Sequence, residues 1–186
     1  ILKDAREMEA FALAIERQAD AGRDALEGTI RVSATEGLGV RWLPHRLVSF
    51  HDRYPRLQVE ILVDNRAVNL LRREADIALR LFRPEQPDLI AKKIGTVAMG
   101  MYGSPAYLAK YGHPRMTADL KNHRHVGFDE SLTQRADVQR LEQRFRPENI
   151  VHRSNSFTGH LEAAAAGIGL VITDCFFGDA HPNLAR

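Results

Sequence analysis

Residues 33–44 read SATEGLGVRWLP and follow directly on a strand-like run, TIRV. After the small and polar residues Thr35, Glu36 and Gly37, apolar side chains recur at helical spacing, which predicts a helix over about 38–54. In open α/β folds, ligands bind at the carboxyl ends of strands, where the free N–H groups of helix N-termini point. This strand-to-helix turn is therefore predicted to form one wall of a binding site.

The composition is that of an ordinary globular protein. The chain has 186 residues, of which 44% are apolar and 27% are charged, with a formal net charge of +2. That charge is too small to indicate nucleic-acid binding by these residues, and no apolar run approaches the roughly 20 residues of a membrane span, so we expect no membrane contact. The single cysteine, Cys175, excludes an internal disulfide framework and fits a reducing, cytoplasmic location.

The segment after residue 28 alternates between strand and helix patterns. Strands are predicted at 29–32, 58–63 and 75–81, with a short helix at 68–74 before the third. Strand, helix, strand, helix, strand is typical of a parallel sheet. The run at 75–81, ADIALRL, has few polar interruptions, which predicts burial on both faces.

A second unit is predicted from about residue 88 to about residue 154. Two apolar strand candidates flank Lys92 and Lys93, and SPAYLAKYG then reads as a complete short helix between Ser104 and Gly112. Further strands are predicted at 125–128, 149–156 and 168–173, and helices within 134–147 and 157–167. We expect residues 155–186 to return toward the first unit and to end in turn-like residues.

Residues 1–27 carry a heptad pattern, which is typical of a helix that buries one seam against a partner. The seam consists of Ile1, Ala5, Met8, Ala12, Ile15, Ala19, Gly22 and Leu26. The segment is predicted to be a linker and dimerisation helix that ends at Gly28; the alternative is a helix packed on its own domain. Because Ile1 is not an initiator methionine, we expect the chain to be a fragment that lacks its natural N-terminal part.

Several segments together resemble LysR-type transcriptional regulators. They are, in the family's order, GTIRVSATEGLGVRWLPHRLVSFHDRYPRLQVEI, LLRREADIALRL, GSPAYLAKYGHP, DLKNHRHVGF and SNSFTGHLEAAAAGIGLVIT. The resemblance implies an α/β, periplasmic-binding-protein-like (type 2) fold of two Rossmann-like lobes over residues 28–186. The lobes would span about 28–87 and 88–154, with a cleft between them.

The resemblance also implies partners. A winged helix-turn-helix domain for binding DNA would precede Ile1, outside this chain, and the regulator would be a homodimer or homotetramer. The sequence departs from the family in two places. The final segment that completes the first lobe is not identified, and residues 134–147 carry no family landmark.

The resemblance implies that a small-molecule effector binds in the cleft, held by strand-to-helix turns from both lobes. The candidates from the first lobe are Thr35, Glu36, Gly37, Arg66 and Leu81. The candidates from the second lobe are Met101, Ser104, Phe128, Asn155, Ser156, Phe157 and Thr158. Three helix starts converging on one cleft would favour an anion.

Several of these residues have alternative interpretations. Glu36 either caps its own helix or faces the cleft, where it would prefer an amine or another hydrogen-bond donor. Arg66 either forks onto a ligand carboxylate or is a solvated turn residue. Ser104 also fits a plain N-cap, and Leu81 and Phe128 also fit core packing.

Other chemistries have weaker support in the sequence. His123 and His125 lack a third metal ligand at suitable spacing, and GLGV and GIGL are too short for a dinucleotide loop. A triad of Ser156, His160 and Asp174 lacks the G-x-S-x-G elbow. The prediction is therefore a non-enzymatic effector-sensing domain of a regulator, without cofactor or metal. The alternative is a solute-binding protein of a transporter.

Overall fold

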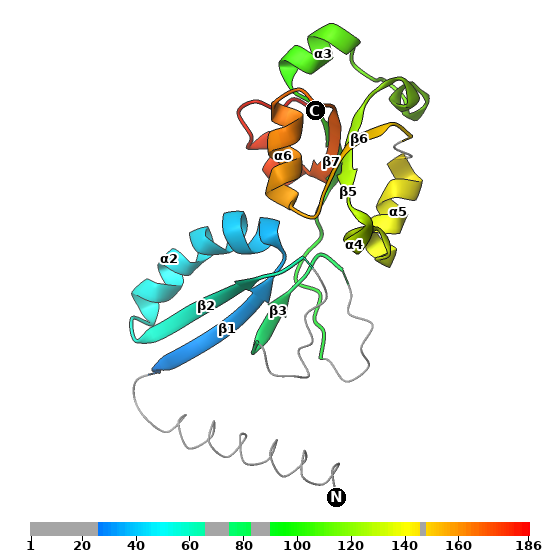
Figure 1. Cartoon of the computed structure of the whole chain (residues 1–186). Coiled ribbons are helices and arrows are strands. Elements are labelled where there is room, and N and C mark those ends of the chain that lie inside the picture. The colour runs from blue at the N-terminus through cyan, green and yellow to red at the C-terminus, as the bar shows by residue number, and fades with distance from the viewer. Residues whose placement is uncertain (1–25, 66–74, 83–89, 146–147) are drawn as a thin grey trace, which may run out of the picture.

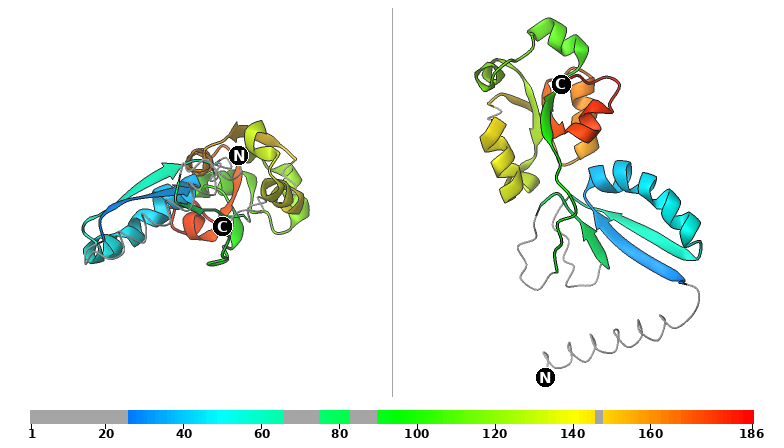
Figure 2. Two further views of the ribbon diagram at one scale, coloured as in Figure 1. Left: turned by 90° about the horizontal axis from the view of Figure 1, so that it is seen from below. Right: turned by 180° about the vertical axis from the view of Figure 1, so that it is seen from behind.

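The computed structural model describes residues 26–65, 75–82, 90–145 and 148–186. Two separate sheets, each with its own helices, form two lobes that lie end to end (Figures 1 and 2). We call the unit around the sheet β2-β1-β3 the first lobe and the unit around β4-β7-β5-β6 the second lobe. The two-lobed α/β architecture expected from the sequence is confirmed.

In its described residues, the first lobe is a parallel sheet covered by one long helix. Its elements are β1 (Gly28–Ala34), a π-helical turn η1 (Gly37–Trp42), α2 (Leu43–Arg53), β2 (Leu57–Val63) and β3 (Ile77–Leu79). β1 pairs in parallel with both neighbours, so that Ala34 lies opposite Val63 and Leu79. The carboxyl ends of these strands therefore meet at one edge, and the parallel pairing predicted from the sequence is confirmed.

The second lobe contains a mixed sheet. Its elements are β4 (Met99–Tyr102), α3 (Pro105–Tyr111), the 3-10 helix η3 (Thr117–Asn122), β5 (His125–Phe128), α4 (Glu130–Thr133), α5 (Ala136–Phe145), β6 (Ile150–Ser154), α6 (Phe157–Ala165), β7 (Leu170–Asp174) and α7 (Cys175–Asp179). β5 runs parallel to β6 and β7, whereas β4 is antiparallel to β7. The predicted short helix is confirmed as α3. The Ser104 hydroxyl accepts a hydrogen bond from the Tyr107 N–H at 3.2 Å, and Gly112 ends the helix.

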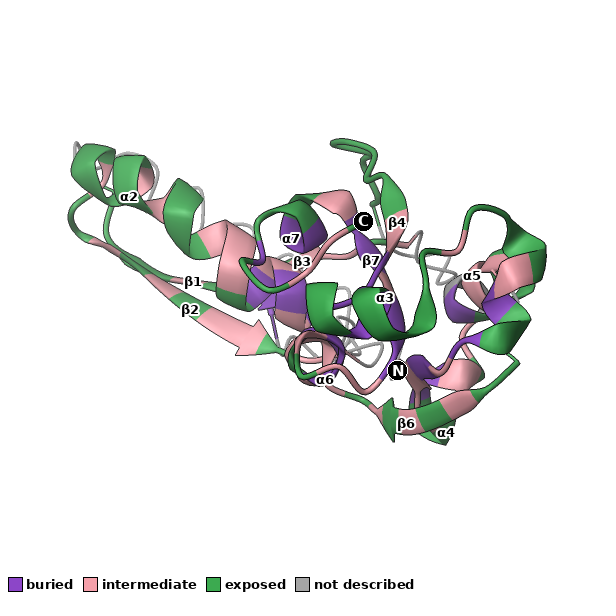
Figure 3. Ribbon diagram, turned by 90° about the horizontal axis from the view of Figure 1, so that it is seen from above, coloured by how far each residue is buried: buried purple, intermediate pink, exposed green. Residues whose placement is uncertain are grey.

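The apolar core of the described residues is concentrated in the second lobe. Its largest cluster includes Tyr102, Leu161 and Val171, which are all at most 1% exposed. Trp42 of the first lobe packs against this cluster, whereas no residue of α2 is buried (Figure 3). The described part of the first lobe therefore buries few side chains of its own.

Two strand predictions in the middle of the chain were confirmed only in part. β3 is shorter than the predicted strand at 75–81, and the predicted burial on both faces was wrong, since Ile77 is 54% exposed and Leu81 46% exposed. Among the described residues β3 pairs only with β1. Of the two candidates beside Lys92 and Lys93, only the later one contains a strand: residues 90–98 contain none, and β4 begins at Met99.

The C-terminal segment also differs from expectation. Residues 155–186 do not return to the first sheet: β7 lies between β4 and β5 in the second, and the chain ends in that lobe (Figure 1). An apolar run predicts a buried strand but carries no signal for which sheet receives it. The tail was predicted as turns, yet α7 forms there, and Ala185 makes a β-bridge with Gly103.

The predicted linker helix and the predicted helix at 68–74 lie outside the described residues, as does Arg66. Gly28, predicted to end the linker helix, is the first residue of β1 and has a φ of 122°. The predicted helix at 38–54 is divided into η1 and α2.

Candidate functional site

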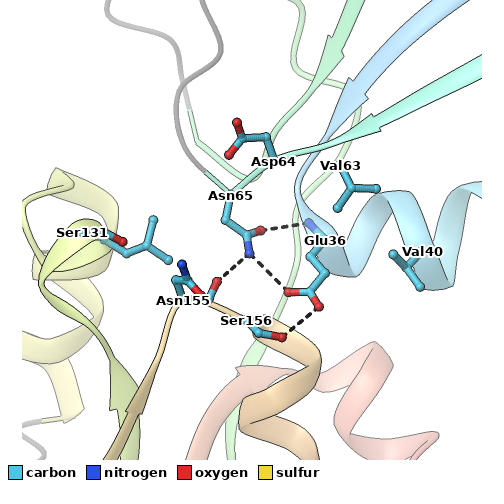
Figure 4. Close-up of a pocket in the computed structure, with 9 residues that line it drawn as sticks. Glu36, Val40, Val63, Asp64, Asn65, Ser131, Asn155 and Ser156 are labelled. Atoms are coloured by element: carbon cyan, nitrogen blue, oxygen red, sulfur yellow. Dashed lines mark hydrogen bonds between the residues drawn. The ribbon is translucent and has the colours of Figure 1, made fainter.

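A cavity of about 300 Å³ lies between the two lobes (Figure 4). The first lobe lines it with Glu36, Val40, Val63, Asp64 and Asn65, and the second with Ser131, Leu132, Asn155 and Ser156. Five of the six polar residues come from three strand ends, because Glu36 follows β1, Asp64 and Asn65 follow β2, and Asn155 and Ser156 follow β6, whereas Ser131 lies in α4. The volume is at the lower end of the roughly 300–1,000 Å³ found for small-molecule sites.

The Glu36 side chain crosses from the first lobe to the second. It makes no capping hydrogen bond to η1, the helix that it precedes. Instead, Oε1 accepts a hydrogen bond from the Ser156 hydroxyl at 2.9 Å, and Oε2 accepts one from the Phe157 backbone N–H at 2.6 Å. Glu36 therefore caps α6 of the opposite lobe, where a negative charge interacts favourably with the helix dipole.

The pKa of the Glu36 carboxyl is lowered by its surroundings in the cleft. Partial burial alone would raise this pKa, because it penalises the charged form. Hydrogen bonds from Ser156, Thr158 and Asn65 and from the Phe157 N–H oppose burial, and the net shift is downward. The carboxyl is therefore ionised at neutral pH, and its charge is an integral part of the contact between the lobes.

Asn65 provides a second bridge between the lobes. Its Oδ1 accepts from the Glu36 backbone N–H at 2.9 Å, and its Nδ2 donates to Glu36 Oε2 at 3.2 Å and to the Asn155 carbonyl at 2.7 Å. Arg135 of the second lobe donates to the Asn65 carbonyl at 2.5 Å and lies 4.2 Å from the centre of the Phe82 ring. Asn65 is thus held from both sides of the cavity.

An apolar contact joins the lobes beside these polar bridges. A Cβ atom added to Gly37 would lie 2.9 Å from a carbon of the Phe177 ring and 3.0 Å from a carbon of the Phe157 ring. The Arg41 guanidinium lies 5.4 Å from the centre of the Phe177 ring. The absence of a side chain at Gly37 therefore lets the first lobe approach the second closely.

The structure brings five of the predicted site residues to the cavity or to its central carboxylate. Glu36, Asn155 and Ser156 line the cavity, the Phe157 N–H donates a hydrogen bond to Glu36, and the Thr158 side chain contributes to the lowered pKa of Glu36. Glu36 faces the cleft, as one of its two interpretations proposed. The role of these residues in binding an effector stays a prediction.

The remaining described candidates do not line the cavity between the lobes. Thr35 and Gly37 are buried, and the Thr35 hydroxyl has no hydrogen-bond partner among the described residues. Leu81 is exposed beyond β3, and Ser104 caps α3.

Two further candidates belong to the interior of the second lobe. Met101 lines a separate cavity of about 80 Å³ there. The Phe128 ring packs edge-on against His160, with 4.9 Å between the ring centres. Both side chains thus take part in packing within that lobe.

Half of the polar residues that line the cavity were not predicted from the sequence. Asp64 and Asn65 directly follow β2, so the strand-end rule that selected Thr35 also applies to them. Ser131 lies in α4, a short helix that the sequence did not predict. Val40, Val63 and Leu132 gave no signal that distinguishes a cavity wall from a core.

The side chains considered for catalysis or metal binding have other partners. The Ser156 hydroxyl donates to Glu36, His160 Nε2 lies 2.8 Å from the Ser154 carbonyl, and Asp174 caps α7, so these residues do not form a triad. His125 Nε2 lies 2.8 Å from the Leu120 carbonyl, and burial lowers the pKa of this histidine. The described ranges contain no cluster of three or more residues able to ligate a metal, and none of their helices has the length and apolarity to cross a membrane.

Comparison with curated proteins finds transcription regulators. The chain is 29% identical over 157 residues to an HTH-type transcriptional regulator of Xanthomonas campestris pv. campestris, covering 78% of this chain and 44% of that protein. It is 30% identical over 149 residues to an HTH-type regulator of Haemophilus influenzae, covering 78% and 51%. The chain thus spans about half the length of these relatives.

Comparison with solved structures agrees. The regulatory domain of CrgA, a LysR-type transcriptional regulator from Neisseria meningitidis, superposes with a TM-score of 0.72 at 24% identity, covering 86% of this chain and 80% of that one. A second structure, of CrgA and not of its regulatory domain alone, also superposes with a TM-score of 0.72. It is 25% identical, and the match covers 98% of this chain and 64% of that one. A family model described as the LysR substrate binding domain matches residues 23–185. By this match, and with two lobes that line a cavity between them, the chain belongs to the LysR substrate-binding domain family.

Proposed function

We propose that this chain is the effector-sensing part of a transcription regulator, and that a small molecule bound in the cavity between the lobes changes the angle between them. The bridges made by Glu36 and Asn65 support this proposal, since each joins one lobe to the other across the cavity. A ligand that replaces or strengthens these bridges alters the relative free energy of the open and closed arrangements. The response is limited by the ligand's differential affinity for the two, about 1–3 kcal/mol in typical cases.

The proposed contacts to the effector come from the residues that line the cavity with side-chain polar groups. They are Glu36, Asn65, Asn155 and Ser156, with Thr158 and the N–H of Phe157 behind them. Val40, Val63 and Leu132 supply the apolar surface. Arg66 directly follows Asn65 in the sequence and stays a proposed contact.

The output of the whole regulator is proposed from its relatives. Residues 1–27 would form the helix that carries the change of angle to a DNA-binding domain, in a homodimer or homotetramer within the cytoplasm. The HTH-type names of the relatives and their greater length support a DNA-binding region beyond this chain. The relatives named here are regulators, which favours this function over the solute-binding alternative and over an enzyme.

A thermal-shift screen of the chain against small metabolites tests the proposal. A ligand of the cavity should raise the melting temperature, and Asn155→Ala and Asn65→Ala should each abolish that rise. Asn122→Ala, an exposed amide in η3, is the matched control and should retain it. Stabilisation that survives in both cavity variants would place the binding site elsewhere.

A further inference from the structure

The N-terminus of α6 is an anion site that the protein fills itself. The Ser156 hydroxyl accepts the Gly159 N–H at 2.9 Å, and the Glu36 carboxylate accepts the Phe157 N–H at 2.6 Å. The positive end of this nine-residue helix points at the cavity, where a carboxylate or phosphate is the favoured partner. In this chain the partner is a side chain of the opposite lobe.

Donors from both lobes occupy most of the acceptor positions of the Glu36 carboxylate. An ionised carboxylate offers about four such positions. Three donors hydrogen-bond to it, namely the Ser156 hydroxyl, the Asn65 amide and the Phe157 N–H. An acidic ligand could reach the end of α6 only by expelling Glu36 from its hydrogen bonds to Ser156 and Phe157.

The charge on the described part of the cavity wall also disfavours an acid. Among the described residues that line the cavity, the ionisable ones are Glu36 and Asp64, and both are acidic. Arg135 and Arg80 lie nearby but are not among these lining residues: Arg135 donates to the Asn65 carbonyl, and Arg80, whose charge interacts with that of Asp64, donates to the Ser33 hydroxyl at 2.7 Å. The rest of the wall combines amide and hydroxyl groups with three aliphatic side chains.

We propose that Glu36 is a resident anion that occupies the acid-binding position of the cleft, so that the cleft takes an amine or an uncharged hydrogen-bond donor with a short apolar part, not a carboxylic acid. This inference rests on the proposed function, because it describes the ligand of the same cavity. It reverses the anion preference that converging helix N-termini would otherwise give.

Two ions of similar size and opposite charge test this inference. Melting temperatures are measured for the wild-type chain, Glu36→Ala and Glu36→Gln in sodium acetate, ethylammonium chloride and sodium chloride at equal ionic strength. In Glu36→Ala the space and the donors are free, and acetate should raise the melting temperature relative to ethylammonium by roughly 2–4 °C more than in the wild type. Glu36→Gln removes the charge but still fills the space, so it should gain no response to acetate.

Two further variants serve as a replacement and as a control. Glu36→Ser also empties the position but keeps a small polar side chain there, so it replaces Glu36→Ala if that variant does not fold. Glu60→Ala removes another first-lobe glutamate, one that bonds Arg31 on the surface, and should behave as the wild type. Acetate stabilising the wild type as strongly as Glu36→Ala, or no gain in either emptied variant, overturns the inference.

The two hypotheses fail in different ways. If the screen finds no metabolite but acetate stabilises Glu36→Ala, the resident-anion inference is supported and the proposed effector function fails. If carboxylic acids stabilise the wild type and lose their effect in Asn155→Ala, the effector site stands and the resident-anion inference fails.

Discussion

The backbone N–H of Phe157 donates a hydrogen bond to Oε2 of Glu36 across the cleft at 2.6 Å. One residue belongs to the first turn of α6 in the second lobe, and the other precedes η1 in the first. A charged acceptor at a helix N-terminus makes a stronger hydrogen bond than a neutral one. The relative position of the lobes is therefore coupled to the ionisation and the placement of a single side chain.

Acid should weaken the contact between the lobes. The pKa of Glu36 is lower in the folded chain than its ordinary value of 4.5, so the ionised form stabilises the fold. That contribution is complete above pH 4.5 and is lost as the pH falls through the lower, folded-state value. Melting temperatures measured between pH 3 and 7 should show a smaller loss on acidification for Glu36→Gln than for the wild type.

A surface carboxylate serves as the internal reference for this comparison. Hydrogen bonds from the backbone N–H groups of Arg115 and Met116 lower the pKa of Asp119, which gives a pH dependence of the same sign. Both proteins retain Asp119, so their difference isolates Glu36. Parallel pH curves for the two proteins would show that the Glu36 charge does not stabilise the contact.

Removal of the Asn65 amide should destabilise the chain. Asn65→Ala leaves the Glu36 backbone N–H without its acceptor and the Asn155 carbonyl without its donor. A typical intramolecular hydrogen bond contributes about 0.5–1.5 kcal/mol to stability. Urea unfolding followed by circular dichroism measures the cost, with Asn122→Ala as the exposed control that should change little. Equal midpoints for the two variants would contradict the bridging role.

The sequence predicted local features well and distant contacts poorly. Ser104, Pro105 and Gly112 define α3 within a few residues of chain, so its limits could be predicted. Glu36 could not be assigned, because its partner Ser156 lies 120 residues away in the sequence. The same turn residues are compatible with a cap on either lobe, and only the packing of the two sheets decides between them.

The composition of the cavity could be predicted only in part. Asn155 and Ser156 follow a recognisable strand and precede a helix, so the strand-end rule finds them. Ser131 and Leu132 face the cavity because α4 packs beside β5, a tertiary fact that the polar sequence does not encode. Leu81 fits a cleft floor by pattern, but β3 is too short to carry it there.

A methyl group at Gly37 should force the lobes apart. Its Cβ would press on the rings of Phe177 and Phe157, and overpacking of this kind costs about 1–3 kcal/mol. Gly37→Ala is therefore expected to melt at a lower temperature, with a larger radius of gyration in solution scattering. Gly95→Ala is the matched control, since a Cβ there has no atom within 4 Å. An unchanged radius together with an unchanged melting temperature would refute the close contact.

Asp174 should tolerate asparagine better than alanine. Its side chain is buried, Oδ1 accepts the Phe177 N–H at 2.9 Å, and Oδ2 is without a hydrogen-bond partner among the described residues. Burial raises the pKa of this carboxyl, although the Phe177 N–H and Arg41 oppose the shift. The raised pKa means that ionisation destabilises the fold, and this loss of stability develops as the pH rises above 3.8.

Asparagine keeps the acceptor without the charge, so Asp174→Asn should match or exceed the wild-type stability at pH 7. Asp174→Ala loses the cap and should cost about 1–2 kcal/mol. Urea unfolding at pH 7 compares the two. An asparagine variant as unstable as the alanine variant would show that the buried charge itself is needed.

The uneven burial of the two lobes sets the order in which the chain opens. Local opening requires least free energy where few apolar contacts are lost, and α2 buries no residue, whereas β5 and β7 enclose the core of the second lobe. Amide protons of α2 should therefore exchange with solvent long before those of the central strands of the second sheet. An effector that links the loosely packed first lobe to the second lobe should slow amide hydrogen exchange in α2, although its own contacts lie elsewhere.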